Sequence, residues 1–376
     1  MSLATALDTL RDAKRVVVKV GSALIAADGV ARQEWLNALA ADIAAWRNAG
    51  QEIVLVSSGA IALGRNQLGP DRPRKLEEKQ AAAALGQPLL MAALTQAFQA
   101  HDLPVAQTLL TLEDTENRRR WLNARATLET LLNAGAIPII NENDSVATDE
   151  IRYGDNDRLA ARVAQMLSAD VLILLSDIDG LYTADPRVNA DAEHISVIDE
   201  LSAAHDDMAG DINRAADTGS GGMATKIVAA RIAQSAGCMT VITRGDRENP
   251  LQALHQGARA TVILSDISPE KAREIWLRGH LTPEGSVTVD AGAVKALKSG
   301  ASLLPVGVTQ VSGQFARGAA IAIHDQNGQL IAKGVIAYSS DDAARIAGLH
   351  TDEVAATLGY RGRPALVHRN DLILES

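Results

Sequence analysis

Short apolar runs rich in β-branched residues alternate with longer helical patterns through the first two thirds of the chain, and this alternation constrains the fold most. The runs fall at residues 15–20, 53–56, 105–110, 137–140, 171–175 and 239–242. Repeated strand–helix–strand alternation predicts an α/β fold, in which a mostly parallel sheet is sandwiched by helices. The run at 171–175 is apolar at every position, as expected of a strand covered on both faces.

The pattern changes after about residue 265. A helical pattern at 266–279 is followed by short strand patterns between glycine turns, at 286–289, 302–305, 307–311, 320–324 and 330–338. We therefore expect three parts: a catalytic domain over residues 1–265, a linker over 266–282, and a small, mainly β domain over 283–376.

Composition narrows the class of protein. The net charge of −10 argues against binding nucleic acid or an anionic membrane through the overall field of the protein. The single cysteine, Cys238, excludes an internal disulfide framework and a CxxC metal site, and its apolar neighbours suggest a small buried residue. No signal peptide and no uninterrupted apolar stretch of membrane-spanning length is visible, so we expect a cytoplasmic protein without a membrane span.

Polar clusters follow several predicted strands, at the carboxyl ends where parallel α/β sheets bind their ligands. Lys19 lies in the first strand, just ahead of a Gly-Ser turn, and a lysine in an apolar strand is costly unless it meets an anion. The serines at 57–58 and the hydroxyl and carboxylate groups at 176–182 also follow strands. The alternatives are a lysine that extends to solvent at a sheet edge, a helix cap by Ser58, and a surface loop.

A denser cluster combines residues 141–145 with residues 154–157, and it holds seven amide or carboxylate side chains. Such groups at strand ends suit the ammonium and carboxylate groups of an amino acid. Two ordinary turns, with Asp157 as a helix cap, are the alternative. Residues 219–226 then form a glycine-rich loop that ends in Lys226 at a helix start, where the helix dipole disfavours a cation unless an anion is bound.

Together these clusters suit phosphoryl transfer, which needs positioned donors and positive charge that follows the moving phosphoryl group. Lys19 and Lys226 are placed to compensate charge at opposite ends of the transfer, and Asp157 to hold both lysines.

With these residues in view, the chain resembles the amino acid kinase family, and within it the members that phosphorylate the side-chain carboxylate of L-glutamate. The resemblance covers about residues 15–245. It rests on the stretches VVVKVGSALI, IVLVSSGAIALG, IPIINENDSVAT, GDNDRLAA, LLSDIDGLYTADPR and GSGGMATK. A sister kinase for aspartate or N-acetylglutamate, and an RNA-binding protein with a vestigial kinase part, remain alternatives.

The resemblance implies a role for each matching residue. Catalysis would fall to Lys19, Lys226 and Asp157, and glutamate binding to Ser58, Asp144 and Asn156. ATP would be held by Lys19, Ser176, Asp177, Ser220, Gly221, Gly222, Met223, Ala224, Thr225 and Lys226. Mg²⁺ would be carried by nucleotide phosphates and water, so no protein ligand for the metal is named. Ser176 and Ser220 replace threonines of the family pattern and keep the hydroxyl.

The C-terminal segment resembles a PUA domain, through TVDAGAVKAL, SLLPVGV and the stretch from FARGAAIAI to IAKGVIAYSS. Residues 281–376 hold eight Lys or Arg against nine Asp or Glu, so their charge does not support RNA binding independent of sequence. The resemblance also implies a homo-oligomer and feedback inhibition by L-proline.

Overall fold

The computed structural model describes residues 3–69, 75–147, 155–209 and 222–375, without the side chains of residues 155 and 276–280. The chain divides into two compact units, Met1–Glu270 and Lys271–Ser376, and each is described here by itself. The sequence-based domain boundaries at 265 and 283 stay a prediction.

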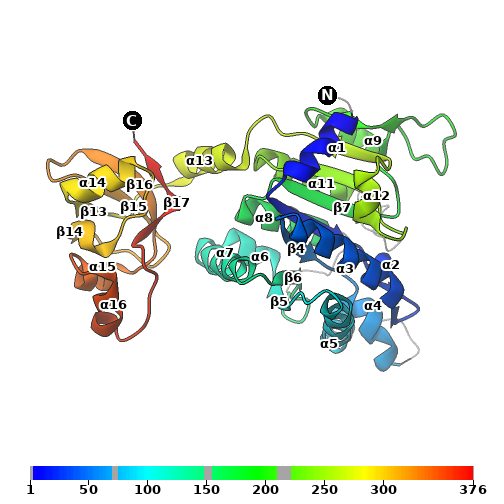
Figure 1. The fold of residues 1–376 in the computed structure, drawn as a ribbon, viewed down its shortest axis with the longest axis horizontal. Coiled ribbons are helices and arrows are strands. Elements are labelled where there is room, and N and C mark those ends of the chain that lie inside the picture. The colour runs from blue at the N-terminus through cyan, green and yellow to red at the C-terminus, as the bar shows by residue number, and fades with distance from the viewer. Residues whose placement is uncertain (1–2, 70–74, 148–154, 210–221, 376) are drawn as a thin grey trace. The chain divides into compact units, whose positions relative to one another are not determined.

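An eight-stranded sheet forms the centre of the first unit, in the order β10-β12-β11-β7-β1-β4-β6-β5. Figure 1 labels β7, β4, β6 and β5 of this sheet. All neighbouring strands pair in parallel except β11 and β12, which are antiparallel. The strands are β1 (Arg15–Val20), β4 (Glu52–Val56), β5 (Val105–Leu110), β6 (Ile137–Glu142), β7 (Val171–Ser176), β10 (Val197–Ile198), β11 (Met239–Arg244) and β12 (Ala260–Ile263). The mostly parallel sheet confirms the predicted fold class.

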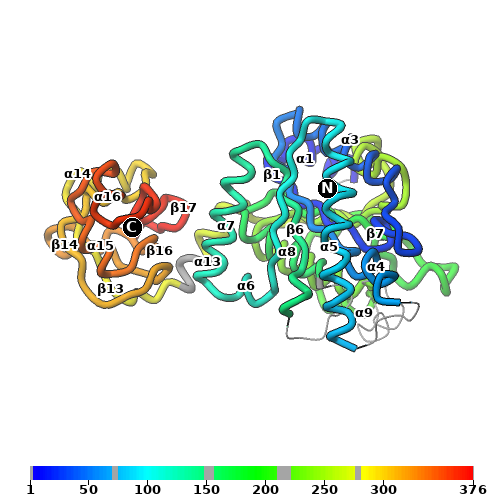
Figure 2. Tube along the Cα trace, turned by 90° about the horizontal axis from the view of Figure 1, so that it is seen from below, coloured from blue at the N-terminus to red at the C-terminus, as the bar shows by residue number. Residues whose placement is uncertain are grey.

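Helices cover both faces of this sheet. On one face α1 (Leu3–Asp12), α3 (Gln33–Asn48), α5 (Leu76–Gln99) and α12 (Pro250–His255) share one apolar core with the strands. On the other face the core is formed with α7 (Arg118–Asn133), α8 (Asp155–Leu167) and α11 (Met223–Ser235). In Figure 2, α8 lies beside β6, in agreement with their contacts. Shorter elements are α2 (Ser22–Ile25), β2 (Ala26–Ala27), β3 (Val30–Ala31), α4 (Ala60–Gly64), η1 (Arg65–Gln67), α6 (Leu112–Glu116), β8 (Leu181–Tyr182), β9 (His194–Ile195) and α9 (Ala203–Ala209).

The six strands predicted in this part of the chain are all present, and β10 and β12 were missed. Both strands are short, with two and four residues, so neither shows a recognisable periodicity of apolar residues. Cys238 is buried as expected, and burial raises the pKa of its thiol.

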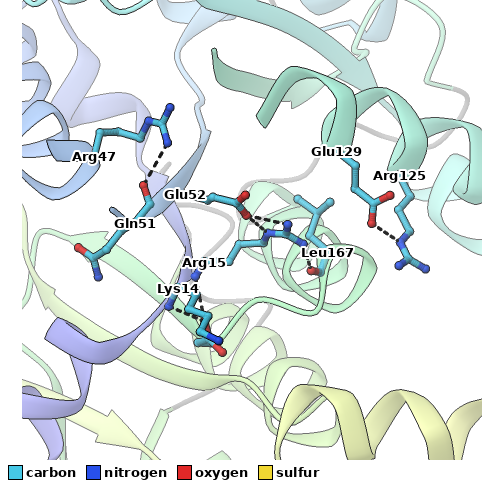
Figure 3. A network of polar contacts seen from close by, with 9 residues as sticks. Lys14, Arg15, Arg47, Gln51, Glu52, Arg125, Glu129 and Leu167 are labelled. Carbon is cyan, nitrogen blue, oxygen red and sulfur yellow. Dashed lines mark hydrogen bonds and ion pairs between the residues drawn. The ribbon is translucent and has the colours of Figure 1, made fainter. Parts of the chain in front are cut away.

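A polar network ties the central strands together, as Figure 3 shows. The Arg15 guanidinium lies 2.7 Å from the Glu52 carboxylate and also donates to the carbonyl oxygen of Leu167. Asp170 accepts hydrogen bonds from the backbone N–H groups of Lys14 and Arg15, at 2.8 and 2.9 Å. The network aligns β1 with β4 and with the start of β7.

Helix α5 is long and apolar enough, by length and composition alone, to cross a membrane. A core helix passes the same test, and α5 buries Leu90, Leu94 and Phe98 in the core of the first unit. One such helix is weak evidence for a membrane span. The expected absence of a span and the cytoplasmic location stay predictions.

Helix α4 packs against α5 at unusually close range because glycines form the contact. A Cβ atom added at Gly86 would lie 1.7 Å from the carbonyl oxygen of Ala60, and one at Gly64 would lie 2.0 Å from that of Ala82. Helix α4 begins directly after Ser58 and Gly59. The glycine contact therefore sets the position of the loop that carries Ser58.

A five-stranded sheet in the order β14-β13-β15-β16-β17 forms the second unit. Only β13 and β15 pair in parallel, and the other neighbours are antiparallel. The strands are β13 (Gly285–Val289), β14 (Val308–Ser312), β15 (Ala320–His324), β16 (Leu330–Ile336) and β17 (Val367–Leu374). They pack with α14 (Ala291–Lys298), α15 (Ser340–Ile346) and α16 (Thr351–Leu358) around one apolar core, and α13 (Pro269–His280) confirms the helix predicted at 266–279.

The strand predicted at residues 302–305 is wrong. Leu303 makes only an isolated bridge to Val367, and the chain then enters the short helix η2 (Pro305–Gly307). Proline fixes its own backbone angle and lacks an N–H group, which favours the start of a helical turn over a strand. The strand β17 and the helices α14 to α16 were not predicted.

Replacing Gly86 by alanine should destabilise the first unit. In an exposed helix this change stabilises by about 1 kcal/mol, but here the new methyl group would overlap the backbone of α4. We expect a lower melting temperature in a thermal unfolding experiment. Ala84→Gly, on the exposed side of α5, is the control and should cost about 1 kcal/mol through helix propensity alone. A Gly86→Ala protein that melts above the unchanged protein would contradict the close contact.

Candidate active site

The carboxyl ends of the central parallel strands meet along one edge of the large sheet. Pairing sets Lys19 of β1 beside Val56 of β4, which pairs with Ile140 of β6. Ser176 at the end of β7 pairs with Arg244 at the end of β11. The polar residues that follow these strands are therefore brought to one edge, as a parallel fold predicts.

Two lysines and one aspartate form a buried cluster at this edge. The Lys19 ammonium lies 2.6 Å from Oδ1 of Asp157, and the Lys226 ammonium lies 3.5 Å from Oδ2. Asp157 has no exposed surface, and the two lysines are almost fully buried. The three side chains come from β1, from the first turn of α8 and from the first turn of α11. The structure thus brings together the three residues for which catalysis was predicted.

Burial and charge set the protonation of this cluster. Burial lowers the pKa of Lys19 below its ordinary value; Asp157 opposes this shift, and nearby Lys226 adds to it. Burial alone would raise the pKa of Asp157, but the two lysine charges and the hydrogen bonds from Lys19 and Thr225 outweigh it, so the pKa is lowered. Two ammonium groups facing one carboxylate leave an excess positive charge, which an anionic ligand would neutralise.

The start of α11 adds further positive potential. The backbone N–H groups of a first helical turn have no partner within the helix, and they carry the positive end of its dipole. Gly222 is the N-cap residue with an extended backbone, and Met223 to Lys226 form the first turn. Ser220 and Gly221 lie outside the described residues. A phosphate is a natural ligand for this combination of N–H groups and a lysine.

Hydrogen-bonded amide side chains lie next to the lysine cluster. Asn156 precedes Asp157 in α8, and its side-chain nitrogen donates to Oγ of Ser58 at 2.8 Å and to Oδ1 of Asn141 at 3.1 Å. Asp144 is buried on the loop that follows β6. The structure therefore brings Ser58 and Asn156 into contact, and the binding roles predicted for these residues and for Asp144 stay predictions.

Asn141 belongs to the polar cluster at 141–145 that the sequence singled out, but it was not among the residues assigned to glutamate, which were Ser58, Asp144 and Asn156. Asn141 is buried, its Oδ1 accepts from Asn156 and from the N–H of Glu142, and its Nδ2 is a buried donor without a hydrogen-bond partner among the described residues. Oδ1 of Asn156 is likewise a buried acceptor without a partner there. Buried polar atoms are almost always satisfied, so this pair suits a polar ligand. The sequence signal was its position directly after the predicted strand at 137–140.

Ser176 and Asp177 lie on the β7 side of the same edge. Ser176 is buried as the last residue of β7, and its hydroxyl donates to Oδ1 of Asp177 at 3.1 Å. The carbonyl oxygen of Ser176 accepts the N–H of Gly245, which joins the ends of β7 and β11. Among the described residues, no group of three or more His, Cys, Asp or Glu side chains is placed to hold a metal ion.

A doubly covered parallel sheet whose carboxyl edge gathers two buried lysines, an organising aspartate and a helix N-terminus defines a phosphotransferase class of site. The chain belongs to the amino acid kinase family, whose sequence profile matches residues 14–244. The profile of the PUA domain matches residues 285–358.

Relatives that align along nearly the whole chain point to one member of this family more specifically than the family profile does. The chain is 55% identical to a glutamate 5-kinase of Paramagnetospirillum magneticum over 371 residues, which cover 98% of this chain and all of that protein. It is 56% identical to a glutamate 5-kinase of Caulobacter vibrioides over 363 residues, which cover 96% of each protein. Among solved structures, carbamate kinase from Giardia lamblia bound to AMP-PNP matches 68% of this chain at 20% identity, with a TM-score of 0.46.

The decline of kcat/KM at alkaline pH should reflect the loss of the proton from the buried Lys19 ammonium. Because burial lowers the pKa of Lys19, its ammonium loses its proton below the ordinary lysine pKa of 10.5, and the positive charge predicted to stabilise the transition state is lost with it. We expect kcat/KM for the nucleotide, which reports groups of the free enzyme, to decline before pH 10.5. A profile that stays level to that pH would contradict the depressed pKa.

Proposed function

We propose that this enzyme transfers the γ-phosphoryl group of ATP to the side-chain carboxylate of L-glutamate. A carboxylate oxygen forms the new bond to the γ-phosphorus as the bond to the bridging oxygen of ADP breaks, and L-glutamyl 5-phosphate and ADP result. The reaction is the first step of proline biosynthesis. The single observation that carries the proposal is the buried Lys19–Asp157–Lys226 cluster, in a chain 55% identical to a glutamate 5-kinase along its length.

The geometry supports a division of labour around the transferring phosphoryl group. Lys19 and Lys226 contribute positive charge from different elements, so they would stabilise charge on the phosphoryl oxygens, while Asp157 keeps both ammonium groups in place. Gly222 and the N–H groups at the start of α11 would receive the nucleotide phosphates, together with Ser220 and Gly221 as the family resemblance implies. Ser176 and Asp177 would complete the ATP side of the site.

Glutamate would bind on the β6 side. Its ammonium group needs acceptors, and Oδ1 of Asn156 and the Asp144 carboxylate can provide them. Its backbone carboxylate needs donors, such as Nδ2 of Asn141 and the Ser58 hydroxyl. Asn156 lies next to Asp157 in sequence, so substrate binding and the catalytic cluster share the start of α8.

Mg²⁺ would reach the site bound to the phosphates of ATP. Asp157 is already bound by two lysines and Thr225, which leaves it poorly suited as a metal ligand, whereas Asp177 is exposed at the end of β7. The metal would neutralise charge on the nucleotide. Inhibition by L-proline and self-association stay predictions of the family resemblance, and the charge of the C-terminal segment does not support RNA binding by the PUA domain.

The experiment that tests this function traps the product. The purified protein is incubated with Mg-ATP, L-glutamate and hydroxylamine, which converts an acyl phosphate to a hydroxamate. We expect glutamate-dependent hydroxamate and a loss of about a hundredfold or more in kcat for Lys226→Ala, because its proposed contact strengthens in the transition state. Lys14→Ala, an exposed lysine of the same unit, is the matched control and should keep normal turnover. Hydroxamate formed only with aspartate or N-acetylglutamate would move the substrate assignment to another acid.

Asp144→Ala should act on substrate binding instead. Loss of a charged hydrogen-bond partner of the glutamate ammonium should raise the KM for glutamate by about tenfold or more. Ser145→Ala, an exposed neighbour on the same loop, should leave that KM unchanged. The measurement is initial rate against glutamate and ATP separately, and a KM change confined to ATP would show that glutamate binds elsewhere.

A further inference from the structure

Thr225, in the first turn of α11, makes a contact that its place in the glycine-rich loop does not predict. Its hydroxyl oxygen lies 2.9 Å from Oδ2 of Asp157 in a buried environment. We propose that Thr225 is a positioning residue that fixes the Asp157 carboxylate between the two lysines, rather than a ligand of the nucleotide. The inference rests on the phosphoryl transfer proposed above.

The hydroxyl has one proton and two acceptors within reach. Oδ2 of Asp157 lies at 2.9 Å and the carbonyl oxygen of Gly222 at 2.8 Å. The Gly222 carbonyl already accepts the backbone N–H of Thr225, whereas the carboxylate is charged and fully buried. A charged acceptor forms the stronger hydrogen bond. The Thr225 hydroxyl therefore donates its hydrogen bond to the Asp157 carboxylate, and not to the Gly222 carbonyl.

The two oxygens of Asp157 are held in different ways. Oδ1 is bound tightly by Lys19 at 2.6 Å, and Oδ2 is bound by Thr225 at 2.9 Å with Lys226 farther away at 3.5 Å. An unobstructed ammonium–carboxylate pair closes to about 2.7–2.9 Å. The Thr225 hydroxyl is therefore the nearer partner of Oδ2, and it shares this oxygen with the Lys226 ammonium. A carboxylate held from both oxygens keeps a fixed orientation between the two lysines.

The contact also joins two helix starts that serve different substrates. Thr225 and Gly222 belong to the start of α11, on the nucleotide side, and Asp157 follows Asn156 at the start of α8. Asn156 in turn donates to Ser58, so the hydroxyl of Thr225 connects the start of α11 with the glutamate side through the adjacent residues Asp157 and Asn156.

The test compares three variants of the full-length protein. Thr225→Val keeps the shape and removes the donor, Thr225→Ser keeps the donor, and Thr240→Val makes the same change at a buried threonine of β11. Thr240 is a suitable control because its hydroxyl has no hydrogen-bond partner among the described residues. We expect Thr225→Val to lower kcat by about tenfold to a hundredfold, the range for a lost hydrogen bond to a charged group, with little change in the KM for ATP. Thr225→Ser should recover most of kcat, and Thr240→Val should retain it.

Two further readouts separate positioning from a merely structural role. The hydrogen bond from Thr225 lowers the pKa of Asp157, so its removal raises that pKa, and the acid limb of the kcat profile should move to higher pH. The Kd for ATP, measured by calorimetry without glutamate, should be unchanged in Thr225→Val, and this readout does not depend on turnover. A weaker Kd for ATP with unchanged kcat would overturn the proposal and make Thr225 a nucleotide ligand.

The outcomes also distinguish this proposal from the proposed function. If the protein without substitutions binds ATP but forms no glutamate hydroxamate, this result would count only against the proposed function. An unaltered Kd for ATP in Thr225→Val would still favour a positioning role for Thr225. If Thr225→Val does not fold, as judged by its melting curve, the Thr225→Ser and Thr225→Ala pair decides. Equal kcat values in those two variants would overturn the need for a hydroxyl.

Discussion

The site depends on one buried carboxylate that is shared by two buried lysines. Asp157 has no access to solvent, so its charge is tolerable only because Lys19 and Lys226 lie against it. The reverse also holds, since either lysine would be costly in this environment without the aspartate. The cluster still carries an excess of positive charge, and this excess is what makes the edge of the sheet attractive to phosphate groups.

The surrounding structure serves to bring these charges together. The lysine of β1 arrives at the edge because the central strands run in parallel, and the two other residues arrive because α8 and α11 pack side by side on one face. The start of α8 has two tasks, since Asn156 binds Ser58 and Asn141 while Asp157 binds the lysines. Displacement of this single helical turn would therefore disturb the amide contacts and the lysine cluster at once.

Much of the fold could be predicted from the sequence because its signals are local. The all-apolar run at 171–175 needs no partner to be recognised as a buried strand, and Lys19 is conspicuous within an apolar strand. The short strand at Ala260–Ile263 has no such period, and its antiparallel pairing with β11 follows from neighbours rather than from its own residues. At 302–305 the apolar composition was misleading, because Pro305 begins a helical turn.

The sequence by itself determined the alternation of strands and helices, the family motifs and the types of residue available for chemistry, since periodicity and residue type are properties of neighbouring positions. Only the tertiary structure decided which of those residues meet. Thr225 belongs to a glycine-rich sequence typical of nucleotide binding, yet its hydroxyl contacts Asp157, and the contact between Asn141 and Asn156 was not predicted. The reason is that a hydrogen bond between distant segments depends on how two helices and a strand pack, and no local pattern in the chain records that packing.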